Sequence, residues 1–194
     1  MIKEIRIAVF GSSKVSVGSP EYRMAYELGL LLGKDGFVHV SGGYGGTMEE
    51  GAKGAREADG KTVGITVTGW GPPNPYISEN IPMPDLFARI GKLMELGDGY
   101  VVLPGATGTL IEMSMAWERA QKGLDRMKPI LLFGDFWLPV IQLVKSQLPH
   151  PSLIHQGDEK CLFGDYLWLA DSPSQAIELL KKIFFSCKSN DKIH

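Results

Sequence analysis

The feature that most constrains the fold of this sequence is a repeated order of apolar run, glycine-containing turn and helical pattern. The runs at 5–10, 37–40 and 100–103 each pass into such a turn, and a segment with helical periodicity follows each turn. Strands that read as continuous apolar runs are typical of parallel sheets, which are buried on both faces. Strands that alternate with helices form right-handed β-α-β units. The order therefore predicts a parallel sheet with helices on both sides.

The same criteria predict the remaining elements. Strands are expected at 5–10, 37–40, 62–67, 100–103, 129–133 and 166–169. Helices are expected at 20–33, 47–57, 85–96, directly after 108, at 136–146 and at 173–185. Prolines within 69–75 exclude a helix or a central strand there, so that segment is a predicted loop. We expect an α/β, Rossmann-like three-layer sandwich with a doubly wound, mainly parallel sheet, as a single nucleotide-binding domain over 1–186 and a frayed tail at 187–194.

Composition and charge exclude several classes of protein. The net charge is −2 and no run of Lys and Arg appears, which disfavours a nucleic-acid partner. Cys161 and Cys187 lie too far apart for a zinc motif or a disulfide framework. The N-terminus has no signal-peptide pattern, and no segment approaches the ~18 apolar residues of a membrane helix. We therefore expect a cytoplasmic protein without a metal, a cofactor or a membrane partner.

Glycine is the one residue in clear excess. The chain has 24 glycines in 194 residues, where the usual frequency of about 7% would give about 14. The turns at 11–13, 42–46 and 105–108 all follow predicted strands, and parallel sheets bind ligands outside the carboxyl ends of their strands. Glycine lets the backbone approach a phosphate, and the next helix presents free N–H groups. Any one of these turns is equally explained as a tight turn, but three on one edge favour phosphate binding.

Two familiar phosphate-binding motifs fail on inspection. Residues 46–51 have the glycine spacing of a P-loop, but Ala52 stands where the lysine is required. The dinucleotide fingerprint begun at 43–45 needs a third glycine at the position of Met48. A P-loop NTPase and an ordinary NAD dehydrogenase are therefore both disfavoured.

The segment 104–112, with the sequence PGATGTLIE, resembles the PGGxGTxxE signature of the Lonely Guy family of nucleoside 5′-monophosphate phosphoribohydrolases. The turn at 11–13 and the loop at 41–48 are similar to the family's first-strand turn and its GGGxxGLM loop. Arg89 lies 15 residues before Pro104, where the family carries an active-site arginine. The resemblance covers roughly 5–133 and implies a nucleoside monophosphate such as AMP as substrate and a homodimer as the assembly.

Two positions depart from the family pattern. Ala106 replaces the second glycine of the signature, and Ile90 stands where a lysine usually follows the arginine. A methyl group at Ala106 crowds the phosphate or forbids a positive φ angle, if the family backbone requires one. These changes favour nucleotide binding over the particular hydrolysis.

The chemistry of N-glycosidic cleavage assigns roles to one acidic and one basic residue, Glu112 and Arg89. Cleavage builds positive charge on the ribose, which a fixed carboxylate stabilises. Glu112, expected in the first turn of its helix, is the candidate carboxylate and also the candidate base toward water. Arg89 is expected to pair with phosphate or with Glu112. The bland alternatives are a glutamate favoured by the helix dipole and a solvated helix charge. The residues expected to bind substrate or phosphate are Gly11, Ser12, Gly42, Gly43, Gly45, Gly46, Thr47, Gly105, Thr107, Gly108 and Thr109.

The sequence leaves a second function open and argues against a third. The main hypothesis is hydrolysis of a nucleoside monophosphate to free base and ribose 5-phosphate. The alternative is a non-catalytic carrier or sensor for a nucleotide or a nucleotide-like group such as molybdenum cofactor, which some relatives of the family bind. A lysine decarboxylase needs a pyridoxal phosphate Schiff base, and Lys53 and Lys92 lie on predicted helices among polar neighbours. His39 is expected in the core, and Trp70 and Tyr76 are either base-stacking or ordinary surface aromatics.

Overall fold

The computed structural model describes residues 4–125, 128–147, 161–163 and 166–185. The tail predicted at 187–194 lies outside these residues. The described strands are β1 (Arg6–Phe10), β2 (Val38–Ser41), β3 (Thr62–Val67), β4 (Glu79–Met83), β5 (Gly99–Val102), β6 (Ile130–Phe133), β7 (Cys161–Phe163) and β8 (Leu167–Ala170). The described helices are α1 (Pro20–Lys34), α2 (Thr47–Glu57), α3 (Leu86–Leu96), α4 (Thr107–Gln121), α5 (Leu138–Lys145) and α6 (Pro173–Phe185). None of these helices is long and apolar enough to cross a membrane.

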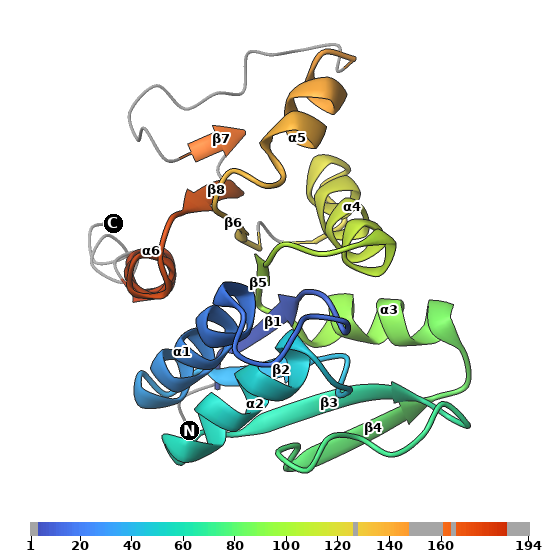
Figure 1. Cartoon of the computed structure of the whole chain (residues 1–194). Helices are drawn as coiled ribbons and strands as arrows, with labels where there is room; N and C mark the ends of the chain where they lie inside the picture. The colour runs from blue at the N-terminus through green and yellow to red at the C-terminus, as the bar shows by residue number, and fades with distance from the viewer. Residues whose placement is uncertain (1–3, 126–127, 148–160, 164–165, 186–194) are drawn as a thin grey trace, which may run out of the picture.

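One sheet of eight strands runs through the described residues, in the order β4-β3-β2-β1-β5-β6-β8-β7. Neighbouring strands are parallel, except that β7 runs antiparallel to β8. The chain proceeds from β1 outward to β4 and then returns to place β5 on the other side of β1 (Figure 1). Open parallel sheets bind their ligands where the strand order reverses in this way. The topology thus directs attention to the loops that follow β1 and β5.

Helices cover both faces of the sheet (Figure 1). Helices α1, α2 and α6 lie on one face, and α3, α4 and α5 lie on the other. Alternate residues of a central strand enter opposite cores: Val9 packs on the side of α1 and α6, whereas Phe10 packs on the side of α3 and α4. Met113 and Trp117 of α4 belong to this second core. The predicted Rossmann-like three-layer sandwich with a doubly wound, mainly parallel sheet is confirmed.

Both outer strands of the sheet escape prediction from the sequence. Strand β4 contains Pro82, is mostly exposed and pairs with β3 alone. An edge strand tolerates proline because the missing N–H is not needed by a second neighbour. Strand β7 has three residues and pairs only with β8. The exposed residues of β4 interrupt the apolar run that marks the central strands, and three residues are too few to mark β7 as a strand.

Candidate active site

A cavity of about 540 Å³ lies at the carboxyl ends of the central strands. Its wall is formed by the loops after β1, β2, β3 and β5, the starts of α2 and α3 and the first two turns of α4. The predicted site residues that line it are Gly11, Ser12, Gly42, Arg89, Thr107, Gly108, Thr109 and Glu112. Segments that are far apart in the sequence thus meet at the reversal of strand order.

Arg89 and Glu112 form an ion pair in this cavity. Arg89 lies in the first turn of α3. Asp85 caps this helix, because its carboxylate accepts a hydrogen bond of 2.9 Å from the N–H of Ala88. The Arg89 Nη1 lies 3.2 Å from the Glu112 Oε1, and Arg89 Nε donates a hydrogen bond of 2.8 Å to the carbonyl of Ile65. Both charged side chains are only 9% exposed. The guanidinium is therefore held between β3 and α4.

The geometry does not fit Glu112 as a glutamate favoured by the helix dipole or Arg89 as a solvated helix charge. Glu112 lies in the second turn of α4, because the helix begins at Thr107; the prediction of a first-turn position was wrong. A helix dipole acts mainly within the first turn, so it does not explain this glutamate. Burial likewise separates Arg89 from the solvated charges of an ordinary helix surface.

Gly42 makes room for the guanidinium. A Cβ atom at this position would lie 1.6 Å from Arg89 Nη2 and 2.8 Å from Met48 Sδ. The glycine at the end of β2 is therefore required by the close approach of a side chain that belongs to α3. The glycine at position 42 of this loop is thus explained by the packing of the Arg89–Glu112 ion pair.

Burial raises the pKa of Glu112 to about 7, although the positive charge of Arg89 and its hydrogen bond oppose the rise. A carboxyl group with this pKa exchanges its proton near neutral pH, which is the property of an efficient general acid or base. Perturbed carboxyl groups in cavities are characteristic of functional sites. The cavity thus combines a poised carboxyl group with a fixed cation.

The N-terminus of α4 is a candidate anion site beside this pair. Ala106 is the N-cap, and its side chain makes no capping hydrogen bond. Thr107 and Gly108 are exposed on the cavity wall, while Thr109 is buried against Gly105. The free N–H groups and the dipole of a helix N-terminus favour a phosphate. Ala106 has φ −100°, so the backbone does not require glycine at this position of the signature.

The other predicted phosphate residues hold the loops together behind the cavity. Thr47 donates to the Ser12 carbonyl through its N–H at 3.0 Å and through its hydroxyl at 3.1 Å. Gly46 packs on the backbone of 12–13, and Gly43 packs on β3. The residues of the predicted set that the structure places outside the cavity lining are Gly43, Gly45, Gly46, Thr47 and Gly105.

The lining also includes residues that are absent from the predicted set: Val9, Ser13, Lys14, Tyr44, Met48, Leu86 and Ala106. Lys14 follows the first glycine turn, and Tyr44 interrupts the second, so their places beside predicted loops were the available signal. Trp70 also lines the cavity, whereas Tyr76 does not. His39 is fully buried in β2, as predicted.

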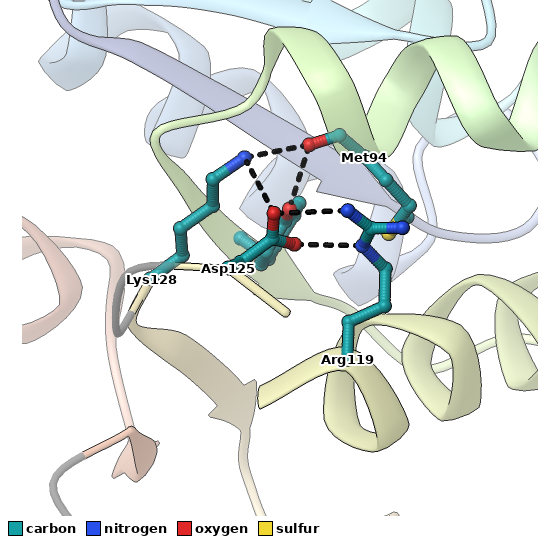
Figure 2. A network of polar contacts seen from close by, with 5 residues as sticks. Met94, Arg119, Asp125 and Lys128 are labelled. Carbon is teal, nitrogen blue, oxygen red and sulfur yellow. Dashed lines mark hydrogen bonds and ion pairs between the residues drawn. The ribbon is translucent and has the colours of Figure 1, made fainter. Parts of the chain in front are cut away.

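The far ends of α3 and α4 are joined by a second polar network. Figure 2 shows Arg119 of α4 bound through two contacts to Asp125, with distances of 2.7 and 2.9 Å. Lys128 contacts the same carboxylate and donates a hydrogen bond of 2.7 Å to the carbonyl of Met94 on α3. Because α3 carries Arg89 and α4 carries Glu112, this network helps to fix the relative position of the two helices.

Ile90, beside Arg89, has no part in the cavity. It is 2% exposed and packs in the core with Leu93 and Met94. The position where the family usually carries a lysine is here an internal packing position of α3. Among the described residues, no group of three or more His, Cys, Asp or Glu side chains is placed to hold a metal ion.

Residues 48–180 match the family model described as "Possible lysine decarboxylase". The chain belongs to this family. The matched segment includes Arg89, the 104–112 signature and Glu112, and the family is the one that the sequence resemblance indicated.

Relatives of the chain have different descriptions. An uncharacterized protein of Archaeoglobus fulgidus is 28% identical over 133 residues, which cover 69% of this chain and 87% of that protein. The pyrimidine/purine nucleotide 5′-monophosphate nucleosidase of Escherichia coli is 30% identical over 133 residues, which cover 61% of this chain and only 29% of the enzyme. The structure of a molybdenum cofactor binding protein from Rippkaea orientalis superposes with a TM-score of 0.74 and 26% identity, over 94% of this chain and 99% of that one.

Proposed function

We propose that this protein is a phosphoribohydrolase that cleaves the N-glycosidic bond of a nucleoside 5′-monophosphate such as AMP. The observation that carries the proposal is the buried Arg89–Glu112 pair beside the free N-terminus of α4. The relationship to a nucleotide 5′-monophosphate nucleosidase supports the same reaction. The products are the free base and ribose 5-phosphate.

The reaction assigns one role to each part of the cavity. The phosphate binds the N–H groups of 107–109 at the start of α4, and the loop at 11–14 closes the other side. The bond between C1′ of the ribose and the base nitrogen breaks, which leaves positive charge on the sugar. Glu112 in its ionised form stabilises this charge, and water adds at C1′. Glu112 takes the proton of the water, which finally resides on the released base.

Arg89 positions Glu112 and sets its protonation. Without the guanidinium the buried carboxyl group would retain its proton to a higher pH, because the positive charge of Arg89 favours the ionised form. Arg89 is held by Ile65 on one side and by Glu112 on the other. The pair therefore supplies a carboxylate in a place where burial alone would leave a carboxylic acid.

The test is release of free base from AMP and CMP by the wild type and by Glu112→Gln. The variant keeps the shape of the side chain and removes its charge, so we expect turnover to fall about 10²–10³-fold. AMP binding should persist because the phosphate contacts lie in other residues. Glu118→Gln is the matched control, since Glu118 lies on the same helix with its side chain exposed to solvent.

The pH dependence of stability shows whether Glu112→Gln loses turnover because it loses a charge or because it unfolds. The pKa of Glu112 in the folded protein lies above its ordinary value of 4.5, so the folded state binds the proton more tightly. The stability from this proton is present below pH 4.5 and is lost as the pH rises through about 7. Glu112→Gln should therefore lack this pH dependence of stability, and its unfolding at the pH of the assay shows whether the variant is folded. Equal turnover of the variant and the wild type would refute the proposed role of Glu112.

A carrier function is the second candidate, favoured by the structural similarity to a molybdenum cofactor binding protein over nearly the whole chain. A carrier would use the same α4 N-terminus for the phosphate of its ligand and would not need Glu112 to lose its proton. The two candidates separate in the experiment above. A wild type that binds AMP but releases no base from any monophosphate would favour the carrier.

We further propose a cytoplasmic homodimer without a resident cofactor, made of one domain over 1–186. Ile111 and Met115 leave apolar surface exposed on α4, which suits a contact between subunits.

Although the family model is described as a possible lysine decarboxylase, we expect no lysine decarboxylation. Lys53 lies near Glu50 and the Tyr26 ring, and Lys92 bonds Glu95. Lys14 lines the cavity but is exposed, unlike the desolvated lysines that form Schiff bases. The purified protein should lack the visible absorbance of pyridoxal phosphate.

A further inference from the structure

Two aromatic side chains lie on the cavity wall beyond Arg89. The ring centroids of Tyr44 and Trp70 are 6.3 Å apart, and the planes are tilted by 33°. The guanidinium of Arg89 lies 5.9 Å from the centroid of the Tyr44 ring. Tyr44 comes from the loop after β2 and Trp70 from the loop after β3, and both line the cavity.

The Tyr44 ring is fixed through its hydroxyl group. The N–H of Val67 donates to the Tyr44 hydroxyl at 2.8 Å, and this hydroxyl donates to the Val67 carbonyl at 3.3 Å. Asn74 also donates to the Tyr44 carbonyl at 2.9 Å. Because the end of β3 occupies the hydroxyl, Tyr44 offers its ring to the cavity and has no hydroxyl proton left to read the edge of a ligand.

Trp70 is held in an exposed position by its backbone. The flanking residues Gly69 and Gly71 have φ angles of +88° and +114°, a region that favours glycine. The Trp70 N–H donates to the Val67 carbonyl at 3.1 Å, which closes a tight turn. The side chain remains 58% exposed. A specialised turn thus presents a large aromatic surface at the cavity instead of packing it in the core.

The order of groups along the cavity matches the order of parts in a nucleotide. The free N–H groups of α4 come first, Glu112 and Arg89 follow within one ion pair, and Tyr44 and Trp70 come beyond Arg89. A nucleoside monophosphate has its phosphate, ribose and base in the same sequence. With the phosphate at α4 and C1′ at Glu112, the base extends toward the aromatic pair.

We propose that Tyr44 and Trp70 form the nucleobase subsite of this cavity and bind the base through its ring face. This inference rests on the proposed function. Every nucleobase has an aromatic face, so stacking tolerates different bases. Met48 and Leu86 add apolar surface to the same cavity. The subsite therefore accepts both purine and pyrimidine nucleotides and favours purines, whose two rings cover more of the aromatic surface.

The test measures binding of AMP, CMP and ribose 5-phosphate by calorimetry, in protein that carries Glu112→Gln so that the nucleotides stay intact. Adding Trp70→Ala should weaken AMP binding about 5-fold to 100-fold, the usual effect of losing one stacking partner. Binding of ribose 5-phosphate should not change because this compound has no base. Trp70→Phe in place of Trp70→Ala should keep most of the AMP affinity. In the protein with Glu112→Gln alone, AMP should bind more tightly than CMP.

Phe87→Ala is the matched control, because Phe87 is an aromatic residue that is 80% exposed on α3 and outside the cavity lining. It should leave AMP binding unchanged. Unchanged AMP affinity in Trp70→Ala would overturn the subsite and leave the proposed function intact. An equal loss for AMP and ribose 5-phosphate would also overturn it, since Trp70 would then act on the sugar phosphate or on the fold. If the protein with Glu112→Gln alone binds neither AMP nor ribose 5-phosphate, the proposed function and the subsite are overturned together.

Discussion

Replacing Gly42 with alanine tests whether the ion pair depends on the space at the end of β2. The new Cβ atom would lie 1.6 Å from Arg89 Nη2, whereas an ordinary contact needs at least 3.4 Å. The guanidinium must therefore move by about 2 Å. Such a movement breaks the 3.2 Å contact with Glu112 or the 2.8 Å hydrogen bond to Ile65.

The expected magnitude follows from the burial of the pair. Removal of one partner from a buried ion pair costs about 3–5 kcal/mol. The displaced Arg89 stays next to an open cavity and regains some water, so we expect the free energy of unfolding to fall by roughly 2–4 kcal/mol. In a chain of this length, the melting temperature should fall by about 5–15 °C. The pKa of Glu112 should rise above 7, because Arg89 no longer opposes the effect of burial.

The assay combines thermal unfolding with the pH dependence of AMP hydrolysis. In Gly42→Ala the ionisation that activates the proposed hydrolysis should shift to higher pH, together with the loss of stability. Gly91→Ala is the matched control: Gly91 lies on α3 and nothing lies within 4 Å of an added Cβ atom. There alanine should stabilise the helix by up to about 1 kcal/mol. If Gly42→Ala melts like the wild type and keeps its pH profile, the argument for a sterically required glycine is refuted.

Three further predictions concern residues outside the ion pair. His39 is fully buried, its ring nitrogens lack a hydrogen-bond partner among the described residues, and burial lowers its pKa from 6.5 to about 4. The unfolded chain takes up this proton first, so about 2 kcal/mol of stability should be lost between pH 7 and pH 5. His39→Leu should reduce that loss in urea unfolding, and an unchanged difference between the two pH values would contradict this. Ala106→Gly should leave AMP hydrolysis nearly unchanged, because the φ angle of Ala106 is already negative. Ile90→Lys should strongly lower the melting temperature, because it places an ammonium group in the core. A large gain in AMP hydrolysis from either change would show that the departure from the family pattern limits the proposed activity.

The central fold was predictable because its elements carry local signals. The apolar runs at 5–10, 62–67 and 100–103 are buried on both faces and therefore lack polar alternation. A glycine turn and then a helical pattern follow the first and the last of these strands. The edge strand β4 carries no such signal, since most of its residues are exposed, and β7 has only three residues.

The candidate site was predictable to the extent that chemistry restricts residue types. A glycine-rich motif before a helix indicates an anion site, and a carboxylate within that helix indicates stabilisation of a ribosyl cation. These considerations, with the family resemblance, named Arg89 and Glu112 as candidates. The exclusion of Ile90 from the site did not follow from the sequence, because it depends on which face of α3 meets the core.

By itself the sequence determined the order of the helices and of every strand except β4 and β7, the edge of the sheet that carries the loops and the residue types available there. Only the tertiary structure decided which of them meet. Gly42 needs to be glycine because Arg89, 47 positions later, passes through the space of its missing side chain. The pKa of Glu112 reaches about 7 because the fold removes water from its carboxyl group. Trp70 approaches Tyr44 because β2 and β3 are neighbours. Burial and long-range contact arise from the packing of distant segments, and no local pattern of residues encodes them.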